Sequence, residues 1–260
     1  MDIDIKIRTL RVKLRKNSKE IIKDVLERHL PRITSTAKSK QELCAFCANK
    51  NNLTKEHVLP KWTFENCTEK FFVTGINGSE HTYNKTTIPV CAECNNNLLG
   101  SFESYIISVL SKTDLSKYFF TDDELQNIIR WLEITEYKFQ LLEIRRKYIK
   151  SKSAAYIEYL RDVPISIMRQ DIDYSPSKAI GQIRIAQRRV TEKSKVNNKN
   201  SLVVFKTTNK SFHFFHHLND FIFLELPKYN IALFYFYSRK FENVEVAKDE
   251  AMKIINKFYN

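Results

Sequence analysis

The sequence contains little glycine or proline and no long apolar run. Only 4 of its 260 residues are glycine and 6 are proline, which excludes collagen-like and low-complexity proteins. No stretch reaches the roughly 18 consecutive apolar residues of a membrane-spanning helix. The first thirty residues alternate charged residues with Ile and Leu, whereas a secretory signal would carry an apolar core there. We therefore expect a cytoplasmic protein that does not enter a membrane.

Positive charge is the most prominent feature of the composition. The chain has 43 Lys and Arg against 30 Asp and Glu, a formal net charge of +13, and an excess of this kind favours a polyanionic partner such as nucleic acid. The excess is concentrated in residues 1–40, with 12 basic and 5 acidic residues, and in residues 182–199, with 6 basic and 1 acidic. Each segment can also be an ordinary solvated face.

Four of the 5 cysteines form two pairs with metal-ligand spacing. Cys44 and Cys47 make one C-x-x-C pair, Cys91 and Cys94 make the other, and 43 residues lie between the pairs. Two such pairs supply four thiolates to one tetrahedral zinc ion, while a thioredoxin-like redox site needs only one pair. A cytoplasmic chain would not keep them as disulfides. We predict a structural zinc site with an insertion between its halves, and Cys67 as a free or buried thiol.

The patterning predicts three regions and an α+β fold. Residues 1–40 are expected to form a basic strand over 3–14 and a helix from Ser18 to Pro31. Residues 41–112 form the cysteine module, with strands at 71–75 and 86–90, a turn around His81, and a helix capped by Asn95 or Asn96.

Residues 113–260 are expected to form an α+β domain of unknown role, with helices followed by a mostly antiparallel sheet. Thr121 and Glu124 have the spacing of a capping box. The expected helices are 125–149, 153–161 and 244–258, and the expected strands are 183–190, 201–207, 211–217, 220–226 and 230–237. Alternation in an aromatic strand explains His213, His216 and His217 better than a second metal site.

The segment from Cys44 to Glu103 carries a specific arrangement of motifs. The first cysteine pair is followed by Glu56-His57-Val58-Leu59-Pro60-Lys61-Trp62, and the second pair runs directly into Asn95. This order resembles the HNH endonuclease family, whose ββα-metal site is held by a four-cysteine zinc. The form with Glu before His is similar to a bacterial branch associated with restriction and anti-phage defence.

The resemblance implies a nuclease that hydrolyses phosphodiester bonds in DNA. His57 would be the general base, which suits an imidazole because its unperturbed pKa is near 6.5. Glu56 and Asn95 would bind the catalytic ion, and such oxygen ligands favour Mg²⁺ or Mn²⁺.

Other positions are assigned less directly. By the spacing that the resemblance implies, Thr86 occupies the position of the residue that orients the base. Asn84, two residues earlier, is the alternative. Glu103, about two helical turns after Asn95, is a further candidate for the site. Lys55 and Lys61 are expected to contact phosphates of the nucleic acid.

Two other functions are compatible with the same residues. One is an RNA-cleaving toxin or effector that a partner protein or a ligand activates through the C-terminal domain. The other is a non-catalytic zinc-knuckle protein that binds nucleic acid. The sequence leaves the oligomeric state open, including a homodimer.

Overall fold

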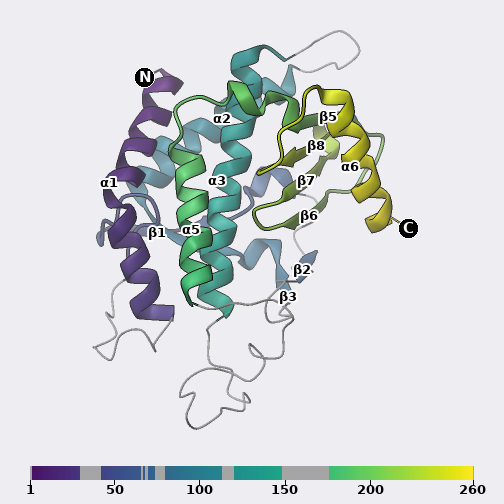
Figure 1. Cartoon of the computed structure of the whole chain (residues 1–260). Helices are drawn as coiled ribbons and strands as arrows, with labels where there is room; N and C mark the ends of the chain where they lie inside the picture. The colour runs from purple at the N-terminus through teal and green to yellow at the C-terminus, as the bar shows by residue number, and fades with distance from the viewer. Residues whose placement is uncertain are drawn as a thin grey trace.

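The structure is a computed structural model that describes residues 2–29, 42–65, 67, 70–73, 80–112, 120–147 and 176–259. It combines helices with antiparallel sheets, which confirms the predicted α+β class (Figure 1). None of the described helices has the length and apolar content needed to cross a membrane.

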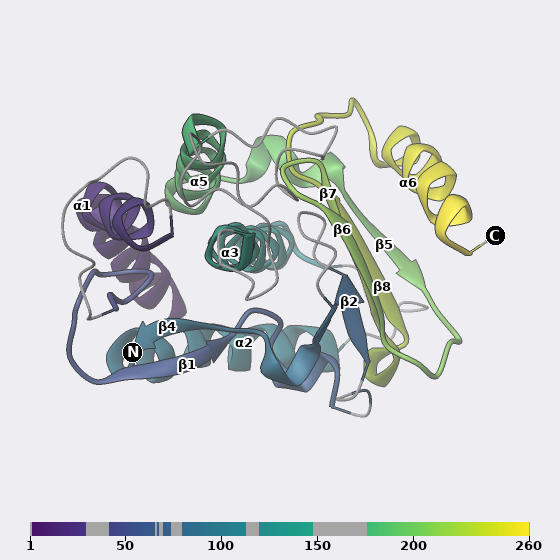
Figure 2. The same ribbon diagram turned by 90° about the horizontal axis from the view of Figure 1, so that it is seen from below.

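Helix α3 (Asp122–Lys147) lies at the centre of the fold. Figure 2 shows it between the helix pair α1 and α5, the hairpin β1–β4 with helix α2, and the C-terminal sheet. Its residues are buried around the whole circumference, including Trp131, Leu132 and Phe139. The capping box is confirmed, because Glu124 accepts a hydrogen bond from the Thr121 amide and donates its own amide to the Thr121 hydroxyl.

Helix α1 (Ile3–His29) replaces the strand predicted over residues 3–14. The buried residues Ile7, Leu10, Leu14 and Ile21 recur at helical spacing and pack into the main core. Ile3 and Ile7 fit this helical period, whereas Ile5, which a strand would place on the same face, is exposed. The strand assignment was therefore wrong.

Helix α5 (Pro176–Thr191) replaces the strand predicted over residues 183–190. Ile183, Ala186 and Val190 are buried at spacings of three and four, whereas Ile185 is among the exposed large hydrophobic residues. A strand would have placed Ile183 and Ile185 on the same face, so the short apolar alternation was misleading here.

The C-terminal sheet confirms the four remaining predicted strands. These are β5 (Leu202–Lys206), β6 (His213–His217), β7 (Phe221–Leu226) and β8 (Ile231–Phe236), in the order β5-β8-β7-β6. One face carries Ile222, Leu224 and Leu233 into the main core, while Phe223 and Phe234 pack under α6 (Val244–Tyr259), as the two-residue period of strands requires.

The cysteine region contains a hairpin followed by a helix. Strand β1 (Leu53–His57) pairs with β4 (Thr87–Cys91), and β2 (Phe71–Val73) pairs with β3 (Glu80–Thr82), all antiparallel. The turn expected around His81 is therefore strand β3. After β4 the chain forms a π-helix over Glu93–Leu99 that continues as α2 (Gly100–Ser111).

Helical structure thus begins before Asn95, so the prediction of Asn95 or Asn96 as its N-cap was wrong. The helix predicted over 153–161 lies outside the described residues. The division into residues 1–40, 41–112 and 113–260 stays a prediction, and α3 packs against parts of all three segments.

Candidate metal centre and catalytic site

The four paired cysteines come together at one end of the β1–β4 hairpin. The sulfur atoms of Cys44, Cys47, Cys91 and Cys94 all lie within 4.8 Å of one another, and the Cys47 and Cys91 sulfurs are 3.5 Å apart. Four sulfurs at about 2.3 Å from a central zinc ion are separated by roughly 3.8 Å. The cluster therefore has the composition and spacing of a tetrahedral zinc site, which sequence spacing had predicted.

Backbone hydrogen bonds shape the first cysteine turn. The Cys44 amide donates to the Asn49 carbonyl at 2.8 Å, and Ala48 adopts a positive φ of 56°. Helix α3 supports the turn from behind, because the Tyr137 hydroxyl donates to the Ala45 carbonyl at 2.6 Å. The Phe46 ring packs edge-on against Tyr137. The first cysteine turn is thus in direct contact with the core residues of α3.

The thiols of the cluster affect one another strongly. Hydrogen bonds from Cys47 and Cys94 lower the pKa of Cys44 to about 2. The same contact with Cys44 raises the pKa of Cys47 to about 12. Four thiolates at this separation repel one another unless a cation lies between them, and a zinc ion would supply that charge.

His57 ends strand β1, opposite Thr87 of β4. Its Nε2 atom lies 3.2 Å from the carbonyl oxygen of Asn84. A carbonyl oxygen can only accept a hydrogen bond, so Nε2 carries the proton and Nδ1 keeps a free lone pair. Burial, opposed by the hydrogen bond to Asn84, lowers the pKa of His57. The imidazole is therefore neutral at pH 7 and can accept a proton at Nδ1.

Of the two residues considered for orienting the base, Asn84 contacts His57 and does so through its backbone. The Thr86 hydroxyl is turned elsewhere, since it donates to the Thr82 carbonyl at 2.8 Å. The Thr86 carbonyl accepts the amide of Val58 and so fixes the chain directly after His57. An amide side chain is not needed for the orienting contact.

Glu56, on the other face of β1, is paired with a buried lysine. Lys138 of α3 forms an ion pair with the Glu56 carboxylate, lies 3.6 Å from a carboxylate oxygen of Glu103, and donates to the His57 carbonyl at 3.1 Å. The Lys138 side chain is only 2% exposed. The ammonium group of Lys138 thus contacts Glu56, Glu103 and the backbone carbonyl of His57.

The charges in this group depend on one another. Burial raises the pKa of Glu103 to about 7, against the attraction of Lys138. Burial alone would lower the pKa of Lys138, but Glu56 and Glu103 outweigh it and raise that pKa. Lys138 is therefore charged, and it is the cation that makes the burial of Glu56 tolerable.

Removing Lys138 is expected to destabilise the protein strongly. Lys138→Met keeps the side-chain volume but leaves Glu56 and Glu103 without their cation, a kind of change that costs about 3–5 kcal/mol. Guanidinium unfolding of the zinc-loaded protein, followed by circular dichroism, measures the difference in the free energy of unfolding.

The matched control for this change is Lys253→Met. Lys253 also pairs with a glutamate, Glu250, but its side chain is 70% exposed, so its loss should leave the unfolding midpoint near that of wild type. If both variants unfold at the same denaturant concentration, the Lys138 ion pairs do not stabilise the fold.

Asn95 lies on the same side of the hairpin as Glu56. Its side-chain amide donates to the Thr54 hydroxyl at 2.8 Å, and Thr54 is two residues before Glu56, so both point to one face of β1. The donor atoms are hard oxygens of the kind that Mg²⁺ and Mn²⁺ prefer. However, Glu56 is already paired with Lys138, and the cysteines are the one group of three or more metal-ligating side chains found among the described residues.

The other candidates lie around this centre or away from it. Lys55 and Lys61 are exposed, and the charge of Lys61 is one of the influences that lower the pKa of His57, after burial. The histidines of β6 are separate: His213 pairs with Glu225 at 2.7 Å, and the partly buried ring of His216 lies 4.3 Å from the Phe139 ring, centre to centre.

Sequence reasoning missed Lys138. A signal was present, because Trp131, Ile134, Lys138 and Leu141 follow one another at spacings of three and four along α3. A lysine inside such an apolar stripe requires a buried acidic partner. The sequence alone did not show which acid that was.

Comparisons with known proteins do not identify a family for this chain. No protein-family model, curated protein or solved structure matches the chain. The resemblance to the HNH family therefore depends on the residues described above and on their arrangement.

Proposed function

We propose that the protein is an HNH-type endonuclease that hydrolyses phosphodiester bonds in DNA, with His57 as the general base. The observation that carries the proposal is the orientation of His57, whose Nε2 faces the Asn84 carbonyl. The hairpin β1–β4 followed by a helix, with four cysteines at its base, is the arrangement that the resemblance implies for such a site.

In this proposal the imidazole takes a proton from the attacking water. Nδ1 of neutral His57 removes the proton as the water oxygen bonds to phosphorus, and proton transfers of this kind contribute about 10²- to 10⁴-fold to rates. Lys61 is exposed close to His57 and would pair with the phosphate on which negative charge develops. The bond to the leaving sugar oxygen then breaks, and that oxygen takes a proton from solvent.

A catalytic Mg²⁺ or Mn²⁺ belongs to the hypothesis through the resemblance. Such an ion would neutralise charge on the phosphate, and Glu56 and Asn95 would be its protein ligands. The side chains as arranged do not form that site, because Glu56 is paired with Lys138 and Asn95 turns its amide nitrogen to Thr54. We therefore assign no step to the metal and leave its requirement to experiment.

DNA is the proposed substrate, and restriction or anti-phage defence is the proposed setting, both from the resemblance. The net charge of +13 supports a nucleic acid in general. RNA is the competing substrate, and a partner protein or ligand that activates the enzyme is compatible with the same site.

A plasmid assay tests the function directly. Zinc-loaded protein is incubated with supercoiled plasmid in Mg²⁺, in Mn²⁺ or in EDTA, beside single-stranded DNA and structured RNA of matched length. The metal requirement that the resemblance implies gives nicked or linear plasmid with either metal ion and intact plasmid in EDTA.

The other outcomes are equally informative. Cleavage that persists in EDTA would contradict the metal requirement while leaving the role of His57 intact. Cleavage of RNA alone would contradict DNA as the substrate. If folded, zinc-loaded protein cleaves none of the three, the nuclease proposal fails for the isolated protein.

A further inference from the structure

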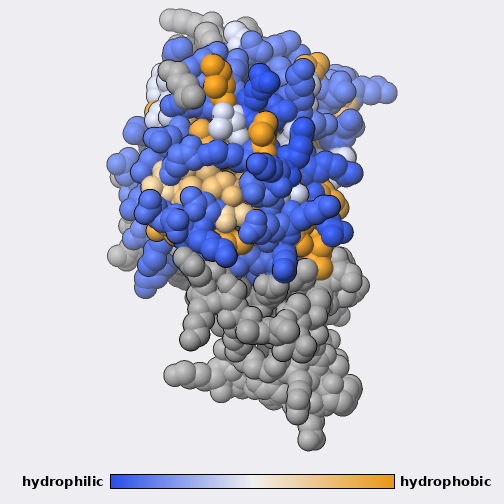
Figure 3. Space-filling view, turned by 90° about the vertical axis from the view of Figure 1, so that its left-hand side faces the viewer, coloured by the Kyte–Doolittle hydropathy of each residue, from blue (hydrophilic) through white to orange (hydrophobic). Residues whose placement is uncertain are grey.

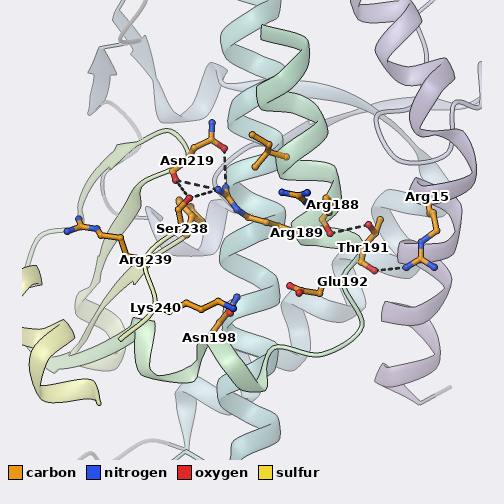
Figure 4. Close-up of a pocket in the computed structure, with 12 residues that line it drawn as sticks. Arg15, Arg188, Arg189, Thr191, Glu192, Asn198, Asn219, Ser238, Arg239 and Lys240 are labelled. Atoms are coloured by element: carbon orange, nitrogen blue, oxygen red, sulfur yellow. Dashed lines mark hydrogen bonds between the residues drawn. The ribbon is translucent and has the colours of Figure 1, made fainter. Parts of the chain in front are cut away.

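A basic trough runs along the junction of α1, α5 and the end of the C-terminal sheet. It consists of two adjoining depressions of about 800 Å³ and 600 Å³ that share Arg15, Arg188 and Thr191. Figure 4 shows the larger one. We define the basic trough by six of its side chains: Arg15, Lys19, Lys23, Arg184, Arg188 and Lys240.

The positive side chains are arranged in two rows. Arg15, Lys19 and Lys23 are four residues apart along α1, which places them about 6 Å apart on one face, and Arg184 and Arg188 repeat this spacing on α5. The rows are held together because Arg15 donates to the Thr191 carbonyl at 2.8 Å. Like charges at this spacing destabilise helices, so the rows are unfavourable for the free protein.

Four of the six trough cations have no acidic partner among the described residues. Within the described part of the chain, no carboxylate pairs with Lys19, Arg184, Arg188 or Lys240. Glu192 is the acidic residue that lines the trough, and it pairs with Lys195. The crowding extends to Arg11, whose pKa is lowered by burial and then by the charges of Arg130, Arg15 and Arg8.

The floor of the trough is fixed. Arg189 lies half-buried, paired with Glu136 of α3 at 2.9 Å and bonded to Asn219 and Ser238 (Figure 4). Its guanidinium lies over the ring of Tyr237, 5.3 Å from the ring centre. The exposed charges therefore sit on a rigid base, which lowers the entropy lost when a ligand orders them.

We infer that the basic trough binds the sugar–phosphate strand of a nucleic acid. A repeating row of cations fits a repeating row of phosphates, and such contacts need no particular base. The trough is elongated and open, and Tyr237, the aromatic residue among its described lining, is buried beneath Arg189. A mononucleotide would need an exposed apolar slot for its base, so the lining favours a polymer.

The trough lies away from the candidate catalytic site. Helix α3 lies between α5 and the hairpin β1–β4 (Figure 2), while α1 contacts the helical segment that follows β4. The face that α1 presents is largely hydrophilic (Figure 3). This binding goes beyond the proposed function, because a nucleic acid can occupy the trough whether or not His57 cleaves it. Cleavage and binding can therefore be tested separately.

The experiment measures binding in a protein that does not consume its probe. In a His57→Ala background, the trough variant Lys19→Gln/Arg184→Gln/Arg188→Gln is compared with Lys248→Gln/Lys253→Gln/Lys257→Gln, which removes three exposed charges from α6. Fluorescence anisotropy follows labelled DNA probes, single-stranded and duplex, across a series of salt concentrations. Unfolding midpoints verify that both variants fold.

We expect the trough variant to bind at least one probe about tenfold or more weakly than the α6 variant. The slope of log affinity against log salt should also fall by about 2 to 3, close to one for each phosphate contact removed. Equal affinities and slopes for the two variants would overturn the inference. So would displacement of the probe by micromolar ATP, because the trough would then be a small-ligand site.

Discussion

His57→Ala should abolish plasmid cleavage while leaving zinc content and thermal stability unchanged. Loss of a general base reduces rates by about 10²- to 10⁴-fold, which brings cleavage below detection in an ordinary plasmid assay. The fold should survive because the imidazole is partly exposed and, among the described residues, hydrogen-bonds to the Asn84 carbonyl alone. Cleavage rates are measured from the conversion of supercoiled plasmid, and zinc by mass spectrometry.

His217→Ala is the matched control for this variant. Its side chain is 69% exposed on β6, far from the hairpin in sequence, so its removal should leave the cleavage rate within about twofold of wild type. Equal rates for His57→Ala and wild type would exclude His57 as the base. A His57→Ala protein that also loses zinc or unfolds early would show a structural role instead.

Cys44→Ser should remove zinc and with it most of the folded structure. Zinc binding to four cysteine ligands is worth about 10–16 kcal/mol in small zinc domains, which exceeds the stability of many whole domains. The cluster also holds the turn that places Phe46 against Tyr137. We expect less than about one tenth of a zinc ion per chain, and loss of the cooperative melting transition in circular dichroism.

Cys67→Ser provides the control for removing a sulfur atom. Cys67 lies outside the four-cysteine cluster and is partly buried. It should keep about one zinc ion per chain and a melting transition close to wild type. If Cys44→Ser keeps its zinc and melts like Cys67→Ser, the cluster is not a structural zinc site.

The local parts of the site were predictable from the sequence. Each C-x-x-C pair brings its own two sulfurs together, since a short turn holds the pair, and the need of zinc for four ligands predicted that the two pairs would meet. Thr121 and Glu124 defined the start of α3 for the same reason, because a capping box involves only neighbours in sequence. The four strands of the C-terminal sheet were found because aromatic and β-branched residues alternate there.

The predictions that were wrong or missing had two causes. Some short patterns fit both a strand and a helix, and some contacts join residues that are distant in the sequence. In α1, Ile3, Ile5 and Ile7 alternate like a strand, and the helical period becomes clear only when Leu10, Leu14 and Ile21 are included. Lys138 meets Glu56 across 82 residues. No pattern near either residue identifies the other, because the pairing depends on how α3 packs against the hairpin.

The packing of α1 against α5 has a consequence for synthesis on the ribosome. Arg15 and the Thr191 carbonyl to which it donates are 176 residues apart. At about 5–20 residues per second, roughly 9 to 35 seconds pass between their translation. Helix α1 therefore waits during that interval for α5, against which it packs in the folded protein. The α1–α5 contact forms only after residue 191 has been translated, and chaperones that shield apolar segments have that interval in which to act.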